Sequence, residues 1–428
     1  MADSRIVRVR AREVLDSRGN PTIEAIVETS SFRAGAIAPS GASTGSHEVL
    51  ELRDGGKRFG GKGVLKAVEN VDKLISAKLK GMDCTDQRAV DEAMIKLDGT
   101  PNKGKLGGNA TTAVSLAVAK AGAMAEGVEL FEHLKPSSDL LPVPMMNIIN
   151  GGKHAGTDLK IQEFMVVPAG APSFSEALRM GAEIYQSLRT LLKETYGPSA
   201  INVGDEGGFA PPFTNTRQAM DMIVKAIEKA GYEPGKEAFL ALDCAASEFC
   251  DRGVYAIDSR RIGPQELLDF YSALKRDYPL VSIEDPVSED AFDQMSLMTM
   301  RMGKRMQLIG DDMFVTNPER IKKAIGLKAG NATLIKVNQI GTVTEAFEAA
   351  EISTNSGYGI VVSHRSGETE DTSIADIAVA MGGGQIKTGA PARGERTAKY
   401  NRLLRIEEIL GDKARFPGLA LYRKPRVE

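Results

Sequence analysis

The sequence predicts an α/β protein in which a C-terminal β/α barrel follows a smaller N-terminal α+β domain. The chain has 428 residues, more than one hydrophobic core usually serves, so two domains are expected. Its first part shows strand patterns followed by helical patterns. Its later part repeats, roughly eight times, a short apolar run, a polar or charged residue and a helical pattern, as a β/α barrel does.

The N-terminal strands are predicted from alternating side chains. Residues 7–10 and 22–27 alternate between apolar and polar positions, and Gly19-Asn20-Pro21 between them is typical of a turn. We therefore expect antiparallel strands here. Apolar residues between positions 64 and 75 recur at three- and four-residue steps, as on the buried face of a helix. Another helix is expected over residues 110–134.

The boundary between the two domains is expected at residues 135–139, where a Lys-Pro-Ser-Ser-Asp segment interrupts the helical pattern. The N-terminal domain then covers residues 1–134 and carries a glycine-hinged loop at residues 40–45. The barrel covers residues 140–428. A second glycine-rich loop, residues 150–156, lies near its start, and we interpret both loops as lids over a binding site.

Most of the predicted barrel strands end in a polar or charged residue. Apolar runs such as residues 201–203, 239–242 and 280–283 lead into such residues. The residues at or just beyond the predicted strand ends are Glu206, Asp243, Glu284, Asp311, Lys336, His364 and Lys387. In a β/α barrel these ends meet at one mouth, whereas a doubly wound open sheet brings together only residues near one switch point. The open sheet would leave most of these residues unexplained, so the barrel is favoured.

Composition and charge exclude several classes of function. A net charge of −3 and a pI near 6.0 give no general attraction to nucleic acid or to an anionic membrane. Charged residues run through the N-terminus, without the apolar segment of a secretory leader. Cys84, Cys244 and Cys250 have no metal-ligand spacing, and an odd number of cysteines is typical of a reducing compartment. We therefore expect a cytoplasmic protein with a small-molecule substrate.

Three carboxylates at predicted strand ends indicate a metal site. Asp243, Glu284 and Asp311 would face one another at the barrel mouth, where like charges raise one another's pKa unless a divalent cation holds them. Their hard oxygen ligands favour Mg²⁺ over zinc or copper. The alternative is that each acid caps the helix after its strand, which explains one such residue more easily than three in register.

Lysines and further acids at the same mouth indicate proton transfer. Lys336 and Lys387 end strands, and Glu163 and Glu206 lie in or beside others. Positive charge near a metal lowers the pKa of a lysine, so that it can act as a base, and a carboxyl that stays partly protonated can act as the acid. Each lysine by itself is more simply a solvated or salt-bridged side chain. Only their shared position at the mouth favours catalysis.

The segment that follows another predicted strand suits a phosphate monoester. Residues 363–367 supply a guanidinium, hydroxyl groups and a flexible backbone. Two other patterns are excluded. Residues 56–62 resemble a P-loop, but Gly63 stands where Ser or Thr is needed, and His47-Glu48 lacks the second histidine of a zinc-protease helix.

Long strings spread over the whole chain resemble those of the enolase family. They are SGASTG (40–45), NGGKHAG (150–156), QEFM (162–165), GDEGGFAP (204–211), LDCAASEF (242–249), SIEDP (282–286), GDD (310–312), IKVNQIGT (335–342), SHRSGETEDT (363–372) and GQIKTGAP (384–391). Mandelate racemases and muconate cycloisomerases share the metal-carboxylate scheme but not these strings. Gly394 departs from the serine usual in the family, away from any implied catalytic position.

The resemblance implies an enolase-type barrel and a Mg²⁺-dependent hydro-lyase of glycolysis and gluconeogenesis that interconverts 2-phosphoglycerate and phosphoenolpyruvate. It implies that Lys336 abstracts the C2 proton and that Glu206, assisted by Glu163, helps to expel the C3 hydroxyl. His154 is also implied as catalytic, closing over the substrate. Two Mg²⁺ ions are implied per active site, one conformational and one catalytic.

The resemblance also implies which residues bind metal and substrate. The implied metal ligands are Asp243, Glu284 and Asp311 for the first ion and Ser43 for the second. The implied substrate-binding residues are Gln162, His154, Glu163, Glu284, Asp311, Lys336, His364, Arg365, Ser366 and Lys387, with Arg365 and Ser366 on the phosphate and Lys387 on the carboxylate. The family is cytoplasmic, with a secondary cell-surface or secreted pool, and forms homodimers and sometimes octamers.

Two rival functions are considered. An enzyme of the same superfamily that acts on another substrate should lack the phosphate-binding residues 364–366, which are present. A non-catalytic binding or structural protein on the same fold would be expected to lose members of the acid, base and metal set, and none is missing. The terminal Val427-Glu428, in place of lysine, weakens a plasminogen-binding role known in the family.

Overall fold

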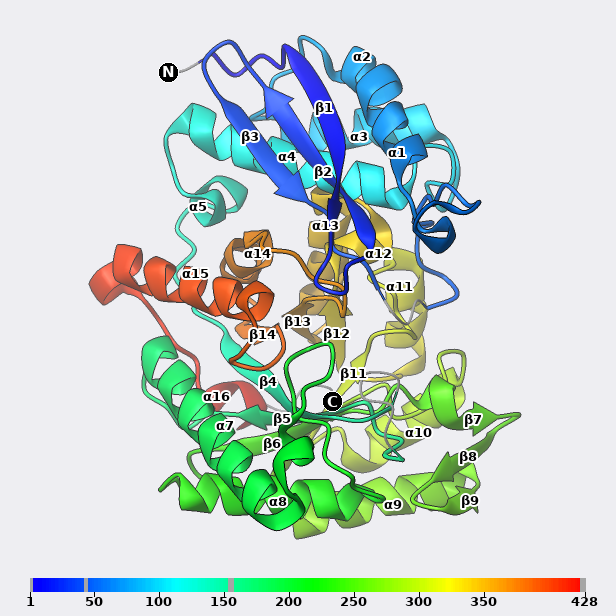
Figure 1. The fold of residues 1–428 in the computed structure, drawn as a ribbon, viewed down its shortest axis with the longest axis vertical. Helices are drawn as coiled ribbons and strands as arrows, with labels where there is room; N and C mark the ends of the chain where they lie inside the picture. The colour runs from blue at the N-terminus through cyan, green and yellow to red at the C-terminus, as the bar shows by residue number, and fades with distance from the viewer. Residues whose placement is uncertain (1–2, 42–44, 153–157, 424–428) are drawn as a thin grey trace.

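The computed structural model describes residues 3–41, 45–152 and 158–423 (Figure 1). Its strands are β1 (Arg8–Leu15), β2 (Pro21–Glu28), β3 (Arg33–Ile37), β4 (Val143–Asn150), β5 (Glu163–Val167), β6 (Phe239–Asp243), β7 (Cys250–Asp251), β8 (Val254–Ile257), β9 (Arg260–Ile262), β10 (Leu280–Glu284), β11 (Gln307–Gly310), β12 (Ala332–Ile335), β13 (Gly359–Ser363) and β14 (Gln385–Lys387).

The helices follow the same order along the chain. The α-helices are α1 (Leu65–Asn70), α2 (Ser76–Leu79), α3 (Gln87–Asp98), α4 (Gly108–Glu126), α5 (Leu130–Leu134), α7 (Phe174–Tyr196), α8 (Thr216–Lys229), α9 (Pro264–Asp277), α10 (Phe292–Met302), α11 (Pro318–Leu327), α12 (Val337–Ile340), α13 (Val343–Asn355), α14 (Ser373–Met381), α15 (Gly394–Leu410) and α16 (Ala420–Arg423). Short 3₁₀ or π turns are η1 (Arg58–Gly61), η2 (Val71–Ile75), η3 (Pro198–Ile201), η4 (Ala246–Phe249) and η5 (Gly411–Lys413).

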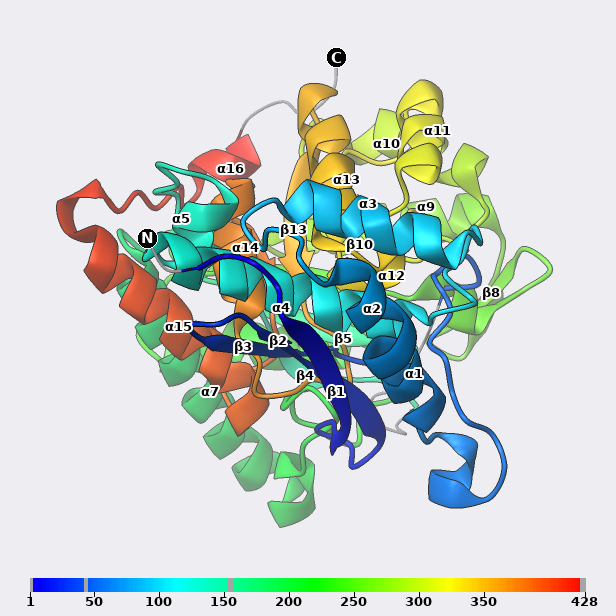
Figure 2. The ribbon, with the colours of Figure 1, turned by 90° about the horizontal axis from the view of Figure 1, so that it is seen from above.

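The N-terminal part is a three-stranded antiparallel sheet packed on helices. The predicted hairpin is present, with Leu15 opposite Pro21 at the turn between β1 and β2. Helix α4 contacts β2 and β3 on one side and α3, α12 and α13 on others (Figures 1 and 2). Because it is enclosed in this way, α4 is buried around nearly its whole circumference, and its sequence is correspondingly rich in alanine and other small residues.

Two predicted helices differ from the expectation. The helix predicted over residues 110–134 is two helices, because Gly127 ends α4 in the left-handed conformation at φ +70°. The helix predicted between positions 64 and 75 is present as α1 followed by the π turn η2. Val71 and Ile75 in that turn are fully buried, as their spacing predicts.

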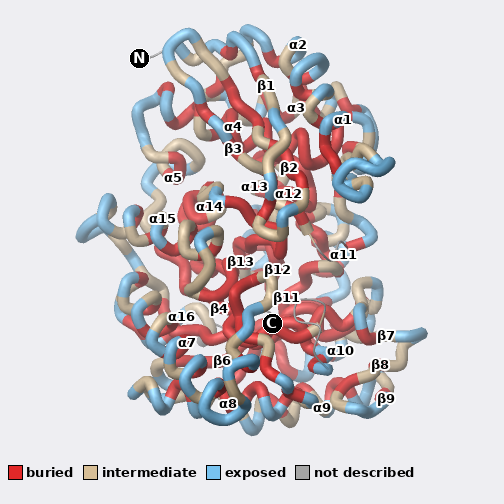
Figure 3. The backbone as a smooth tube through the Cα atoms, viewed as in Figure 1, coloured by how far each residue is buried: buried red, intermediate tan, exposed pale blue. Residues whose placement is uncertain are grey.

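The C-terminal part is a closed eight-stranded barrel, so the predicted fold class is confirmed. The strand order is β10-β11-β12-β13-β14-β4-β5-β6, closing between β6 and β10. Neighbouring strands are parallel except that β5 runs antiparallel to both β4 and β6. As a result, the first residue of β5 lies at the end of the barrel where the parallel strands finish. The barrel strands form the buried centre of this part, with helices outside them (Figures 1 and 3).

The prediction of a barrel strand at residues 201–203 is wrong. The segment instead follows the 3₁₀ turn η3, which begins at Pro198, and only Val203 pairs, in a single bridge to Phe209. The first two barrel strands are β4 and β5 instead. The loop after Val203 returns to the barrel through Phe209, which donates its backbone N–H to the Ile148 carbonyl at 2.9 Å. This contact places the Glu206 loop over the barrel mouth.

Buried polar contacts fix the N-terminal part onto the barrel. The fully buried Asp91 accepts hydrogen bonds from the backbone N–H of Thr344 at 3.0 Å and from its hydroxyl at 2.6 Å. Lys103 pairs with Glu345 at 2.9 Å beside them. Because these contacts are specific and shielded from water, they hold the N-terminal part at a defined position over the barrel mouth. Along the parts of the chain that are described, no helix is long and apolar enough to cross a membrane.

Candidate active site

Carboxylates and a lysine from different strands meet at the barrel mouth. Asp243 ends β6, Glu284 ends β10 and Lys387 ends β14. The Lys387 ammonium lies 2.8 Å from both Asp243 Oδ2 and Glu284 Oε2, and 3.2 Å from Glu163 Oε1. Burial alone would lower the pKa of Lys387, but the surrounding carboxylates, Asp243 first, raise it well above its ordinary value. The lysine is therefore a fixed positive charge in the site.

A second lysine is paired with the third predicted metal ligand. Lys336 follows β12, and its Nζ lies 2.5 Å from Asp311 Oδ2. Gln339 donates to the other oxygen, Asp311 Oδ1, at 2.8 Å. Burial and Arg365 lower the pKa of Lys336, but Asp311 outweighs them and leaves it above its ordinary value. This differs from the lowered pKa expected for a base, because in this pairing the ammonium has a carboxylate partner.

The oxygen-rich mouth fits a divalent cation. Glu284 Oε1 is buried and has no hydrogen-bond partner among the described residues, and burial followed by Asp243 raises the pKa of Glu284 well above its ordinary value. Such a carboxylate is costly to keep charged unless a cation is bound. Each member of the predicted set Asp243, Glu284 and Asp311 contacts a lysine ammonium. Within residues 3–41, 45–152 and 158–423, the groups whose possible ligand atoms lie within 4.8 Å of one another are Asp285, Asp311 and Asp312, and Glu163, Glu206 and His364.

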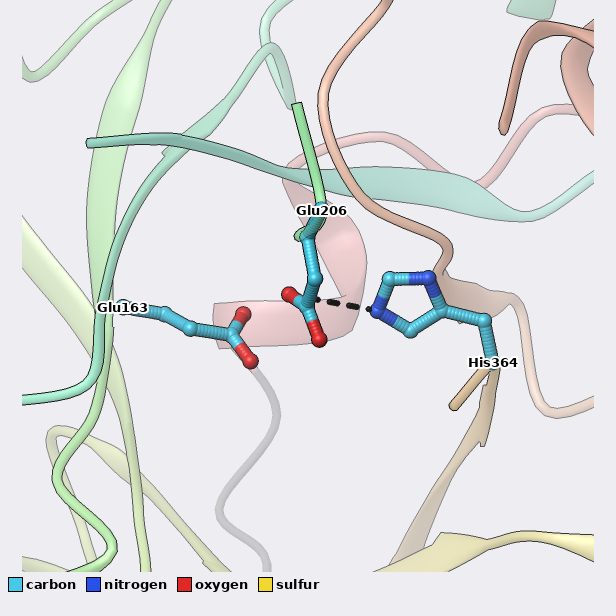
Figure 4. Close-up of side chains that lie close together, drawn as sticks. All are labelled: Glu163, Glu206 and His364. Atoms are coloured by element: carbon cyan, nitrogen blue, oxygen red, sulfur yellow. Dashed lines mark ion pairs between the residues drawn. The ribbon is translucent and has the colours of Figure 1, made fainter. Parts of the chain in front are cut away.

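Two glutamates and a histidine form the opposite part of the site (Figure 4). Glu163 begins β5, Glu206 lies in the loop before α8, and His364 follows β13. The Glu163 and Glu206 carboxylates lie next to one another, and the His364 ring points at Glu206, with Nε2 3.4 Å from Oε2. Asn147 donates to the same Glu206 oxygen at 3.0 Å. Burial, then the charge of Glu206, raises the pKa of Glu163 well above its ordinary value, so the pair can retain a proton.

An arginine after β13 is held by a residue of the N-terminal part. Arg365 is buried, and its Nη1 and Nη2 lie 2.8 Å and 3.1 Å from the Glu48 carboxylate oxygens. Asn338 also accepts from Nη1 at 3.1 Å. Glu48 further accepts the backbone N–H of Gly45 at 3.0 Å. Glu48 therefore joins the predicted phosphate-binding arginine to the segment that follows the first predicted lid.

The structure brings together most of the predicted site residues. A single cleft is lined by Gln162, Glu163, Glu206, Asp243, Asp311, Lys336, His364, Arg365, Ser366 and Lys387, together with Ala245, Asp285, Asp312 and Ser363. Glu284 lies beneath this cleft, in contact with Lys387. Gln162 is placed by its backbone N–H, which donates to the Asp243 carbonyl at 3.0 Å. Ser43 and His154 lie outside the described residues.

Sequence reasoning missed two positioning carboxylates. Glu48 was considered only as part of a failed zinc pattern, although it lies three residues after the lid string. Asp285, at φ +40°, accepts the backbone N–H groups of Asp311 at 2.9 Å and Asp312 at 2.7 Å. It thereby fixes the loop that carries Asp311. Its place in the SIEDP string was the available indication, since an acid directly after a strand-end acid can bind the neighbouring loop.

We expect Glu48→Gln to destabilise the fold more than an ordinary ion-pair substitution. The change leaves the buried Arg365 guanidinium without its counter-charge, and breaking a buried pair of this kind costs about 3 kcal/mol. Urea denaturation should report this loss. The loss should shrink in saturating 2-phosphoglycerate, because the substrate phosphate supplies the missing charge to Arg365.

The matched control is Glu51→Gln. Glu51 pairs with Arg53 at 2.7 Å in a more exposed position, and Arg53 lies outside the cleft. Its loss should cost less than about 1 kcal/mol, and substrate should not change it. Equal costs for the two variants, with no effect of substrate on either, would contradict the role given to Glu48.

Comparison with known proteins agrees with this geometry. A family model described as the enolase N-terminal domain matches residues 6–134, and one described as the enolase C-terminal TIM barrel domain matches residues 138–424. The enolase of Methanocaldococcus jannaschii is 58% identical over 403 residues, which cover 94% of each chain. The enolase of Methanopyrus kandleri is 57% identical over 416 residues, covering 96% of this chain and 97% of the relative. The chain belongs to the enolase family.

Membership assigns the reaction. The protein is a carbon–oxygen lyase, a phosphopyruvate hydratase, that reversibly dehydrates 2-phosphoglycerate to phosphoenolpyruvate in glycolysis and gluconeogenesis. The enolase family uses Mg²⁺, which agrees with the carboxylate-rich mouth. The enolase of Thermococcus kodakarensis, 55% identical over 423 residues and 98% of each chain, extends the similarity to nearly the full length.

Proposed function

We propose that Lys336 is the base and Glu206 the acid of the dehydration, with Glu163 assisting Glu206. The observation that carries this proposal is the barrel order. Lys336 follows β12 and Glu163 begins β5, and β13, β14 and β4 separate these strands on one side and β11, β10 and β6 on the other. Base and acid therefore approach a substrate in the mouth from opposite walls. This arrangement suits removal of a C2 proton and a C3 hydroxyl from opposite faces.

Lys336 becomes a stronger base when Asp311 is engaged elsewhere. Asp311 is the influence that raises the pKa of this lysine, and burial, Arg365 and Lys387 all lower it. Without the carboxylate partner, the neutral amine is favoured and can accept the C2 proton. On the opposite wall, the raised pKa of Glu163 supports retention of a proton beside Glu206, where a leaving hydroxide needs one.

Positive groups around the mouth are assigned to the two ends of the substrate. Arg365 and Ser366 bind the phosphate, and Lys387 binds the carboxylate. Gln162 and His364 line the same cleft and contribute hydrogen bonds to the bound substrate. His154, which lies outside the described residues, is assigned by family resemblance to closure over the substrate. These groups orient the substrate and displace water from the reacting atoms.

We propose that two Mg²⁺ ions bind per active site. Asp243, Glu284 and Asp311 would hold the first ion, and Ser43, outside the described residues, would contribute to the second. Bound ions supply Lewis-acid stabilisation for the negative charge that develops on the substrate carboxylate as C2 loses its proton. The support for the first ion is the convergence of buried carboxylates, one of which has an oxygen without a partner among the described residues.

Equilibrium dialysis tests the metal assignment. We expect about one Mg²⁺ per chain without substrate and about two with an equilibrated mixture of 2-phosphoglycerate and phosphoenolpyruvate. Asp243→Asn should weaken the first ion, since it removes a charged oxygen ligand. Ser43→Ala should leave the first ion bound and weaken only the second. One ion per chain under both conditions, or identical binding in Asp243→Asn, would refute the assignment.

The finer organisation of the protein is proposed on the family resemblance. The two domains cover residues 1–134 and 140–428, with the boundary at residues 135–139. The protein acts as a homodimer, and mass photometry would distinguish this from a monomer or an octamer. A glycolytic reaction and three free cysteines favour the cytoplasm.

A further inference from the structure

A buried arginine lies behind the loop that carries His364, Arg365 and Ser366. Arg396 is in the first turn of α15, is fully buried and lies outside the residues that line the cleft. Its Nη1 donates to the Arg365 carbonyl at 2.6 Å, and its Nη2 donates to the Ser366 carbonyl at 2.7 Å. One side chain therefore holds two consecutive carbonyls of the predicted phosphate-binding loop.

The same guanidinium contacts two further groups. Nη2 also donates to the Asp205 carbonyl at 3.1 Å, immediately before Glu206. Nη1 also lies 2.6 Å from His364 Nδ1. Each terminal nitrogen carries two hydrogens, so these four contacts use all the N–H groups of Nη1 and Nη2. Arg396 thus joins the Glu206 loop to the His364 loop from outside the cleft.

The contact with Nδ1 determines the tautomer of His364. A guanidinium only donates hydrogen bonds, so Nδ1 must accept and the ring hydrogen must be on Nε2. Nε2 is the atom that lies 3.4 Å from Glu206 Oε2 (Figure 4). Burial, more than the charge of Arg396, lowers the pKa of His364 to about 4, so the ring is neutral at neutral pH.

We propose that Arg396 is a positioning residue for the dehydration step, acting through His364 on Glu206. It holds His364 in the Nε2–H tautomer, and this N–H joins Asn147 Nδ2 in pointing at Glu206 Oε2. Since both donors lie on one oxygen, the proton of the acid is carried on the other oxygen, Oε1. This inference rests on the proposed role of Glu206.

The first test reads the tautomer directly. The chain has four histidines, so the ¹⁵N imidazole signals of His364 can be assigned by their absence in His364→Gln. We expect a protonated Nε2 and an unprotonated Nδ1 in the wild type. Arg396→Met, which keeps the volume but removes the donors, should shift or mix the two tautomers. A wild-type ring protonated on Nδ1, or an unchanged tautomer in Arg396→Met, overturns the proposal whatever the role of Glu206.

The second test compares two rates in each variant. Arg396→Met should slow dehydration about tenfold, the effect of one positioned hydrogen bond, while exchange of the C2 proton with solvent and the KM for 2-phosphoglycerate stay within about threefold. Equal losses in both rates would show a merely structural role. If Arg396→Met does not fold, Arg396→Lys is measured in its place, because a lysine keeps the charge but cannot make the forked contacts.

Two controls separate the proposal from its premises. Arg402→Met removes another arginine of α15, which pairs with Asp376 and Glu129, and it should affect stability without changing the ratio of the two rates. In a His364→Gln background, the Arg396 substitution should not change the ratio further, and a further change would overturn the proposed route. Failure of Glu206→Gln to separate exchange from dehydration would remove the role of Glu206, whereas the tautomer measurement would still decide the contact.

Discussion

Replacement of Lys336 by alanine should abolish both proton exchange at C2 and dehydration. A general base contributes up to about 10⁴-fold to a proton transfer, and we expect losses of about that size in both rates. The two fall together because dehydration follows removal of the C2 proton, so an enzyme without its base cannot reach the later step. Solvent-deuterium incorporation into 2-phosphoglycerate and phosphoenolpyruvate formation measure the two rates.

Mg²⁺ binding separates loss of the base from loss of the site. Lys336 contacts Asp311, a proposed metal ligand, so equilibrium dialysis of Lys336→Ala should still find the first ion bound. The control is Lys322→Ala on the exposed side of α11, where Lys322 pairs only with Glu319 among its printed ion pairs, and both rates should stay within about twofold. Exchange retained in Lys336→Ala would place the base elsewhere.

Glu206→Gln should separate the two steps. An amide keeps the size of the side chain and can still accept from Asn147, but it cannot deliver a proton to the leaving C3 hydroxyl. We expect dehydration to fall about 10²- to 10⁴-fold, while exchange of the C2 proton remains because Lys336 on the opposite wall is unaffected. The same deuterium assay, run beside phosphoenolpyruvate formation, provides both rates.

Two comparisons make this result interpretable. Glu163→Gln should impair dehydration as well, because Glu163 lies beside Glu206 and shares its proton environment. The exposed Glu194→Gln, whose partner is Lys229, should change neither rate. Loss of exchange in Glu206→Gln equal to its loss of dehydration would show that Glu206 is not specific to the second step.

Local sequence patterns predicted the strand ends well wherever a residue directly follows an apolar strand. Asp243, Glu284 and Lys387 are the last residues of β6, β10 and β14, as the alternation of apolar run and polar residue indicated. The pattern failed at residues 201–203, where an apolar run is followed by an acid but Pro198 begins a 3₁₀ turn. A run this short fits either structure, and the choice depends on contacts with β4 that are far away in the sequence.

The sequence by itself determined the barrel, the enolase family and the kinds of residue at the mouth, because periodicity and motif strings are local properties of the chain. Only the tertiary structure decided how these groups are paired. The antiparallel β5 places Glu163 opposite Lys336, Glu48 reaches Arg365 from the N-terminal part, and Arg396 binds His364 from α15. Such contacts join residues that are tens to hundreds of positions apart, and a buried charge accepts whichever partner the packing brings to it.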